Sequence, residues 1–240
     1  MAKKENRVLV VGDIHLPYDK PGYLHFCKDV YNKMQCNKVV FIGDVVDLHA
    51  FNYHEKHPES DGPLAELVKA RAAVKRWARA FPKAAITVGN HDRLIIRKAH
   101  TGGLPQVTLR TFNELWETPH WQWVTEVVID GVRYIHGDGA GGGLYPAYNV
   151  MRKTALSHVL GHSHTASGIK WLCNPERRLF GMDVGSGIQS SAIQFLYQER
   201  NPVKPVISCG TVCGGIPQLW IMPCGRGEKY HDSKFKGGRQ

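Results

Sequence analysis

The chain has 240 residues, 31 Lys and Arg against 21 Asp and Glu, a formal net charge of +10 and a pI near 9.4. This length suits one domain with a substantial core. No apolar run is long enough to span a bilayer or to form a secretion signal. We therefore expect a cytoplasmic protein in a reducing compartment, without a membrane partner. The six cysteines form no C-x-x-C pair, which argues against a zinc knuckle or a disulfide framework, while the positive charge favours a polyanionic partner, nucleic acid first.

The first elements are a strand at 7–12, a helix at 23–34 and a second strand at 38–43, which together predict a right-handed βαβ unit. Asp13-Ile14-His15 follows the first strand, and Gly43-Asp44-Val45-Val46-Asp47 ends the second. Both segments place carboxylates at the C-terminal ends of strands, where open α/β sheets carry their chemistry.

An irregular stretch at 48–62 follows, and we predict that it is a surface loop whose histidines (His49, His54, His57) face solvent or cap local structure. A long helix is expected to begin at Pro63, with a basic outer face that is either simply solvated or part of a nucleic-acid groove. The third strand then runs into Gly89-Asn90-His91-Asp92.

The second half alternates strands and turns. We predict a helical turn at 92–98, a short helix near 111–116, a hairpin of 121–129 with 132–135 around Asp130-Gly131, a helix at 146–156 and a strand at 158–161. The glycine-rich loop at 137–143 lacks the Gly-Lys-Ser/Thr ending of a P-loop, which disfavours a nucleotide cradle. Short β segments at 168–173, 178–184, 205–212 and 217–222 are expected to pair as antiparallel hairpins. A single domain would therefore occupy 1–223, and 224–240 would be a basic, mobile tail.

The same sequence pattern recurs at five strand ends. An apolar run is followed, in most cases after a glycine, by a residue of a type that binds metals. The resulting candidate metal ligands are Asp13, His15, Asp44, Asn90, His136, His162 and His164. Mixed oxygen and nitrogen ligands suit manganese, iron, zinc or nickel, whereas an all-oxygen set would indicate magnesium or calcium. Because these candidates exceed the needs of one ion and a carboxylate can bridge, we predict two divalent ions, with manganese preferred.

These motifs, D-x-H, G-D-x-x-D, G-N-H-D, a lone His136 and Gly161-His162-Ser163-His164, resemble those of the calcineurin-like metallophosphoesterase superfamily over residues 8–164. The resemblance implies an α/β fold of four layers, α/β/β/α, in which two mixed sheets are flanked by helices and the terminal hairpins belong to the second sheet. It further implies two ligand sets that share Asp44: Asp13, His15, Asp44 and His164 for one ion, and Asp44, Asn90, His136 and His162 for the other. His91 would be the general acid, and Asp47 would orient it.

One position departs from the Ser/Thr protein phosphatase branch, in which an Arg that grips the substrate phosphate follows the second motif. Here Leu48 follows Asp47. Since a monoester dianion needs such an arginine more than a diester does, we predict a phosphodiesterase or nuclease. Arg93 and Arg97 are either phosphate contacts or exposed charges on a helix. The alternatives are a phosphomonoesterase acting on nucleotides or small phosphates, and a catalytically silent scaffold or binding protein. The sequence indicates no oligomeric state.

Overall fold

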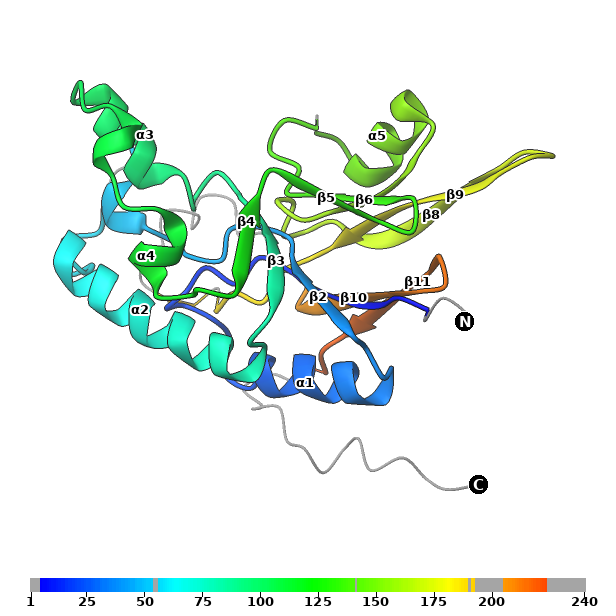
Figure 1. The fold of residues 1–240 in the computed structure, drawn as a ribbon, viewed down its shortest axis with the longest axis horizontal. Helices are drawn as coiled ribbons and strands as arrows, with labels where there is room; N and C mark the ends of the chain where they lie inside the picture. The colour runs from blue at the N-terminus through cyan, green and yellow to red at the C-terminus, as the bar shows by residue number, and fades with distance from the viewer. Residues whose placement is uncertain (1–4, 54–55, 141, 190, 193–204, 224–240) are drawn as a thin grey trace.

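Two mixed β-sheets lie face to face at the centre of the molecule, and helices cover their outer faces (Figure 1). The computed structural model describes residues 5–53, 56–140, 142–189, 191–192 and 205–223. The expected α/β class with two mixed sheets flanked by helices is confirmed. The predicted tail at 224–240, like His54, lies outside the described residues.

The first sheet has the strand order β11-β10-β1-β2-β3-β4. Its parallel part consists of β1 (Arg7–Val11), β2 (Lys38–Phe41), β3 (Ala84–Thr87) and β4 (Trp121–Val124), and its antiparallel edge of β10 (Ser208–Cys213) and β11 (Ile216–Ile221). The inner parallel strands β1, β2 and β3 are mostly buried, because one face packs on helices and the other on the second sheet.

The second sheet has the order β5-β6-β7-β9-β8. Its strands are β5 (Glu126–Ile129), β6 (Val132–Ile135), β7 (Ser157–Leu160), β8 (Ser167–Cys173) and β9 (Arg178–Val184). The central strands β6, β7 and β9 are parallel, and β5 and β8 run antiparallel to their neighbours. As predicted, Asp130-Gly131 forms the β5–β6 turn, with φ angles of 49° and 76° that suit a tight hairpin.

Alternation along the strands divides the core into layers. Val8 and Val10 of β1 face the second sheet, where they meet side chains such as Tyr134 and Met182. Leu9 and Val11 point the other way, into the layer beneath the helices. The residues that follow β1 and β2 of the first sheet and β6 and β7 of the second cluster together, so the C-terminal ends of these strands share one edge of the sandwich.

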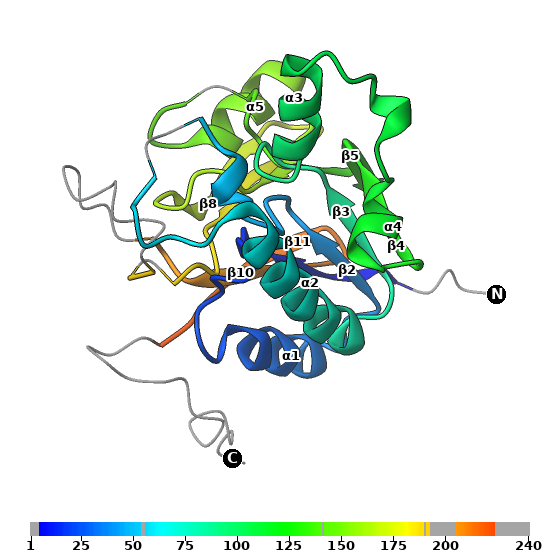
Figure 2. The same ribbon diagram turned by 90° about the vertical axis from the view of Figure 1, so that its left-hand side faces the viewer.

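The helices hold this arrangement from outside. The helix α1 (Tyr23–Lys33) and the helix α2 (Pro63–Ala80) lie side by side on the first sheet (Figure 2), and buried Phe26 and Trp77 fill their contact with it. On the second sheet, α5 (Pro146–Thr154) packs against β9, where Gly181 leaves room for the helix backbone. The remaining helical segments are η1 (His49–Phe51), α3 (Leu94–Thr101), η2 (Gln106–Thr108) and α4 (Phe112–Trp116). In the described part of the chain, no helix combines the length and the apolar character that a membrane crossing requires.

Two expectations were wrong. The segment 121–129 is not one strand, because β4 joins the first sheet and β5 the second, so the chain changes sheets at Thr125. The β10–β11 hairpin belongs to the first sheet, since β10 pairs with β1. Of the two roles expected for the loop histidines, His49 has the local one: its ring is buried, and its Nδ1 lies 3.1 Å from Nδ2 of Asn52 at the end of η1. Glu66 of α2 accepts hydrogen bonds from the backbone N–H groups of His49 and Ala50 at 2.7 Å.

Candidate metal centre

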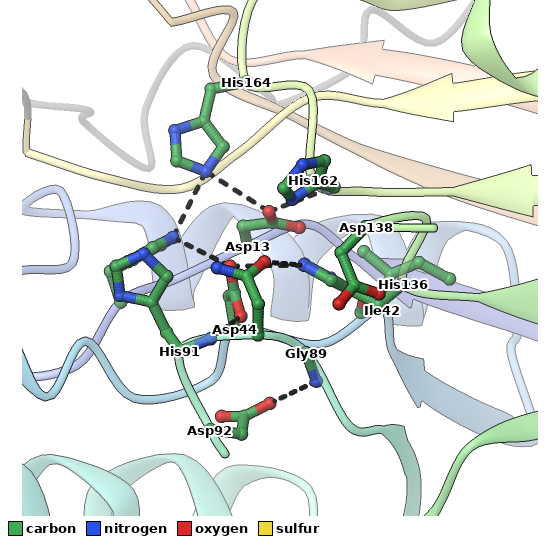
Figure 3. A network of polar contacts seen from close by, with 12 residues as sticks. Asp13, Ile42, Asp44, Gly89, His91, Asp92, His136, Asp138, His162 and His164 are labelled. Atoms are coloured by element: carbon green, nitrogen blue, oxygen red, sulfur yellow. Dashed lines mark hydrogen bonds and ion pairs between the residues drawn. The ribbon is translucent and has the colours of Figure 1, made fainter. Parts of the chain in front are cut away.

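The seven predicted ligands meet at one edge of the sandwich, although they come from five strand ends (Figure 3). The loops after β1, β2 and β3 approach from the first sheet, and those after β6 and β7 from the second. Parallel strands place their carboxyl ends at one edge, so residues far apart in sequence become neighbours there.

The first group of side chains consists of Asp13, His15 and His164. Nε2 of His164 lies 3.2 Å from Nε2 of His15 and 3.2 Å from Oδ2 of Asp13. His15 and Asp13 are fully buried, whereas His164 is partly open to solvent. Three potential ligand atoms therefore lie within 4.8 Å of one another, and one of the three side chains is open to solvent.

The second group is Asp44, Asn90, His136 and His162. Nε2 of His136 lies 3.2 Å from Oδ2 of Asp44 and 3.0 Å from Oδ1 of Asn90. His162 completes a cluster with Asp44 and His136, and it is exposed. The same Oδ2 atom of Asp44 is 3.7 Å from Nε2 of His15, so this carboxylate lies between the two groups.

The donor set fits two divalent cations. Two neutral imidazole nitrogens that face each other at 3.2 Å cannot both act as acceptors without a cation or a proton between them. Oδ1 of Asp13 is buried and has no hydrogen-bond partner among the described residues. Buried carboxylates that lack a compensating partner are costly, and a bound cation supplies that partner.

Glycines make room for the two carboxylates. A Cβ atom on Gly161 would collide with Oδ1 of Asp13 and with Ile42, and one on Gly89 would collide with Oδ1 of Asp44. The glycine that precedes a ligand in these two motifs therefore allows a second loop to pass directly over a carboxylate.

Three of the candidate ligands have a strained backbone. His15, Asp44 and His162 have φ angles of 46°, 46° and 64°, in the left-handed region that side chains rarely adopt. Such conformations persist where the surrounding structure imposes them, and they cluster at functional sites.

The buried carboxylates and imidazoles of this cluster shift one another's pKa values strongly. Burial alone raises the pKa of Asp44, but His136 and His91 outweigh it and hold that pKa well below its usual range. Burial lowers the pKa of His91, and the carboxylates of Asp44 and Asp47 reverse this effect and raise the pKa to about 10. The site thus stabilises ionised carboxylates next to protonated or metal-bound imidazoles.

His91 stands beside the ligands. Its backbone N–H donates to Oδ1 of Asp44 at 2.8 Å, and its Nδ1 lies 2.6 Å from the backbone carbonyl oxygen of Asp47. The Asp47 carboxylate is farther from this nitrogen, at 3.3 Å, and makes its close contact, 2.6 Å, with Nδ1 of His15. Asp47 therefore holds His91 through its main chain and His15 through its side chain.

Asp92 is a part of the site to which the sequence analysis gave no role. Its buried carboxylate accepts from Val46 N at 3.2 Å and from Gly89 N at 2.8 Å. Burial, reinforced by the charge of Asp44, raises the pKa of Asp92 to about 7. The side chain joins the loop after β2 to the loop after β3, and its only sequence signal was its place in the third motif.

The two arginines proposed as phosphate contacts lie outside the ligand cluster. Arg93 forms an ion pair with Asp138 of the glycine-rich loop, and Arg97 lies 5.3 Å from the ring centroid of Tyr53. Leu48 is fully buried, so its position offers substrate no side chain. Asp138, which no sequence motif singled out, is the partner that holds Arg93 near the site.

Comparisons with known proteins identify the family of the chain. The sequence model of the calcineurin-like phosphoesterase family matches residues 6–184. Solved structures similar to this chain include an archaeal phosphodiesterase, with 11% identity, a TM-score of 0.49 and coverage of 90% of this chain and 99% of that one. Vacuolar protein sorting 29 of Cryptosporidium parvum has 13% identity and a TM-score of 0.46, with coverage of 90% of this chain and 96% of that one. A nuclease of Pseudomonas putida has 16% identity and a TM-score of 0.36, with coverage of 89% of this chain and 86% of that one. No curated protein sequence matches the chain.

Proposed function

Because the chain belongs to the calcineurin-like phosphoesterase family, we propose that it is a two-metal phosphodiesterase that cleaves nucleic acid or nucleotides in the cytoplasm. The observation that carries the proposal is the position of Asp44, whose Oδ2 atom lies 3.2 Å from His136 and 3.7 Å from His15. One carboxylate between two sets of imidazoles is the arrangement that a pair of bridged ions needs.

The residues divide between the two ions as follows. Asp13, His15, Asp44 and His164 would hold one ion, and Asp44, Asn90, His136 and His162 the other. Manganese is the preferred occupant, and iron, zinc or nickel are alternatives that suit the same mixed ligands. When bound, the cations neutralise phosphate oxygens and lower the pKa of a coordinated water.

The protein itself supplies the acid. With Nδ1 of His91 engaged by the Asp47 carbonyl at 2.6 Å, Nε2 is the ring atom that gives a proton to the leaving oxygen. The bond from the His91 N–H to Asp44 keeps this ring at a constant position relative to the bridging carboxylate. The His91 side chain is 22% exposed, so a leaving group reaches it from solvent.

The proposed preference for diesters rests on the absence of a phosphate-binding arginine after Asp47. A monoester phosphate carries nearly two negative charges and a diester carries one, so the diester depends less on arginine. Leu48 is buried where an arginine would stand, and Arg93 is already paired with Asp138. The net charge of +10 favours attraction of a polyanion such as nucleic acid.

A comparison of substrates by manganese-loaded protein tests the proposal. We expect hydrolysis of bis(4-nitrophenyl) phosphate and of single- or double-stranded DNA, with little hydrolysis of 4-nitrophenyl phosphate. Asp44→Asn should abolish the activity, and Glu176→Gln, at an exposed position, should leave it unchanged. Activity confined to the monoester would favour the phosphomonoesterase alternative. Less than one bound metal per chain after reconstitution would favour a scaffold.

A further inference from the structure

A pocket of about 400 Å³ opens on the outer face of the second sheet, between the start of α5 and the strands β8 and β9. Its wall includes Tyr145, Ser163, Thr165, Lys170 and Asp183. Sites for small ligands have volumes of about 300–1,000 Å³, so this pocket has the size of a binding site. None of these residues belongs to the ligand or acid set described above.

The pocket adjoins the metal centre. Ser163, which lines it, lies between His162 and His164, so one three-residue segment faces both the ligand clusters and the pocket. A phosphodiester has a substituent on each side of its phosphorus, and only one of them is the leaving group. A diester held at the clusters therefore has a second substituent that a neighbouring pocket of this kind can accept.

The charged groups of the pocket lie on one surface. Nζ of exposed Lys170 lies 4.5 Å from the ring centroid of Tyr145, which is itself 42% exposed. An aromatic ring does not neutralise an ammonium group or use all three of its donors, so Lys170 keeps donors for an anion. Lys170 and Asp183 project from the same face of the sheet, because β8 and β9 pair Lys170 with Gly181 and Gly168 with Asp183.

Asp183 gives the pocket a polar floor. Its carboxylate is nearly buried and accepts a hydrogen bond from Ala147 N at 3.1 Å, at the start of α5. With the hydroxyl groups of Ser163 and Thr165, it supplies acceptors and donors for sugar hydroxyls or a base edge. A ligand that carried negative charge throughout would be repelled by this carboxylate, whereas a nucleoside with a phosphate at one end matches both ends of the pocket.

We propose that this pocket binds the nucleoside next to the scissile phosphate, with Lys170 contacting the following phosphate and Tyr145 contacting the base or sugar. The inference rests on the proposed function and deepens it, because it makes a nucleotide chain, and not an arbitrary diester, the substrate class. Bases stack on aromatic side chains whatever their sequence, so recognition here would be tolerant of sequence.

A binding measurement separates this inference from catalysis. Fluorescence anisotropy of a labelled oligothymidylate with the metal-free full-length chain, which does not turn over, gives the affinity. Lys170→Met should weaken binding about fivefold to tenfold. It should also make the negative slope of the logarithm of the association constant against the logarithm of salt concentration shallower by about 0.7, the value for one phosphate contact on a single strand. Lys28→Met is the matched control, because Lys28 is exposed on α1, which packs on the first sheet, and it should change neither quantity.

Kinetics of the manganese-loaded enzyme give the second arm. For a dinucleotide with a terminal phosphate, Lys170→Met and Tyr145→Leu should raise KM about fivefold to tenfold and leave kcat within about twofold. With bis(4-nitrophenyl) phosphate, which has no second phosphate, both variants should match the wild type. Equal losses on both substrates, or unchanged oligonucleotide binding by Lys170→Met, would overturn the inference. If the wild type cleaves no diester but the Lys170 effect on binding persists, the proposed function fails and the nucleotide site stands.

Discussion

Asp47 contacts two histidines with two different groups: its carboxylate lies 2.6 Å from Nδ1 of His15, and its backbone carbonyl lies 2.6 Å from Nδ1 of His91. The orienting role that the family resemblance implies for Asp47 toward His91 thus falls mainly to the main chain. The side chain instead orients a proposed metal ligand and fixes which His15 nitrogen faces the cluster. Replacing the side chain and replacing His91 should therefore have different consequences.

Asp47→Asn should weaken metal binding about 10- to 100-fold, because an amide oxygen supports the His15 ring less strongly than a carboxylate. The carbonyl contact to His91 remains in this variant. Titration of the metal-free protein with manganese, followed by calorimetry, measures the change, with Glu176→Gln as the control. A variant with wild-type metal affinity and reduced turnover would instead assign the Asp47 carboxylate to His91.

His91→Ala should lower kcat on diesters about 10²- to 10⁴-fold, the usual contribution of a general acid, without loss of metal. The expected split arises because His91 touches Asp44 through its backbone N–H, which alanine keeps. Metal content and kcat measured on one preparation decide the matter. Loss of bound metal together with activity would make His91 a ligand and remove its role as the acid.

Glu66 should make stability depend on pH. Burial, with a smaller contribution from the negative charge of Asp47, raises the pKa of Glu66 to about 7. The hydrogen bonds from the N–H groups of Ala50 and His49 oppose this rise but do not cancel it. A pKa raised in the folded state means that the folded chain binds more protons, so the stability from Glu66 is complete below about pH 4.5 and is lost as the pH rises through about 7. The loss amounts to roughly 3 kcal/mol at most.

Urea denaturation of the wild type and of Glu66→Gln from pH 4.5 to 8 checks this dependence. As the pH rises to about 7, the wild type should lose unfolding free energy relative to Glu66→Gln, and above that pH the difference should stay constant. A constant offset is also expected, because glutamine has one acceptor oxygen for the two backbone donors of η1. A difference that does not vary with pH would show that Glu66 keeps an ordinary pKa.

Gly161→Ala should disrupt the first metal group, because the new Cβ atom would meet Oδ1 of Asp13 and the side chain of Ile42. We expect a loss of about 1–3 kcal/mol in unfolding free energy and weaker metal binding. Gly168→Ala is the matched control, since no atom lies within 4 Å of a Cβ built there. Similar behaviour of the two variants in thermal denaturation and metal titration would refute the close approach.

The clustering of the candidate ligands could be predicted from sequence because each candidate follows an apolar strand within a few residues. Local strand signals therefore located Asp13, Asp44, Asn90, His136 and His162 at one edge without any knowledge of the sheet order. Asp92 was within reach of the same reasoning, as it belongs to the third motif. Its bonds to Val46 and Gly89 depend on how two loops pass each other, which no local pattern encodes.

The errors have a different origin. Residues 121–129 read as one β segment because both halves favour extended structure, and only tertiary pairing sends β4 to β3 and β5 to β6. The position of β10 beside β1 joins residues some two hundred positions apart. The pocket formed by Tyr145, Lys170 and Asp183 is similarly non-local. Sequence periodicity indicates which residues are buried, but not which distant strand they meet.

The central claim, that one carboxylate joins two metal ions, is tested most directly by anomalous X-ray diffraction from crystals grown with manganese. The account predicts two anomalous peaks roughly 3.5–4 Å apart, with Asp44 bound to both, His15 and His164 on one side, and His136 and Asn90 on the other. A single peak, or two peaks that do not share Asp44, would contradict it.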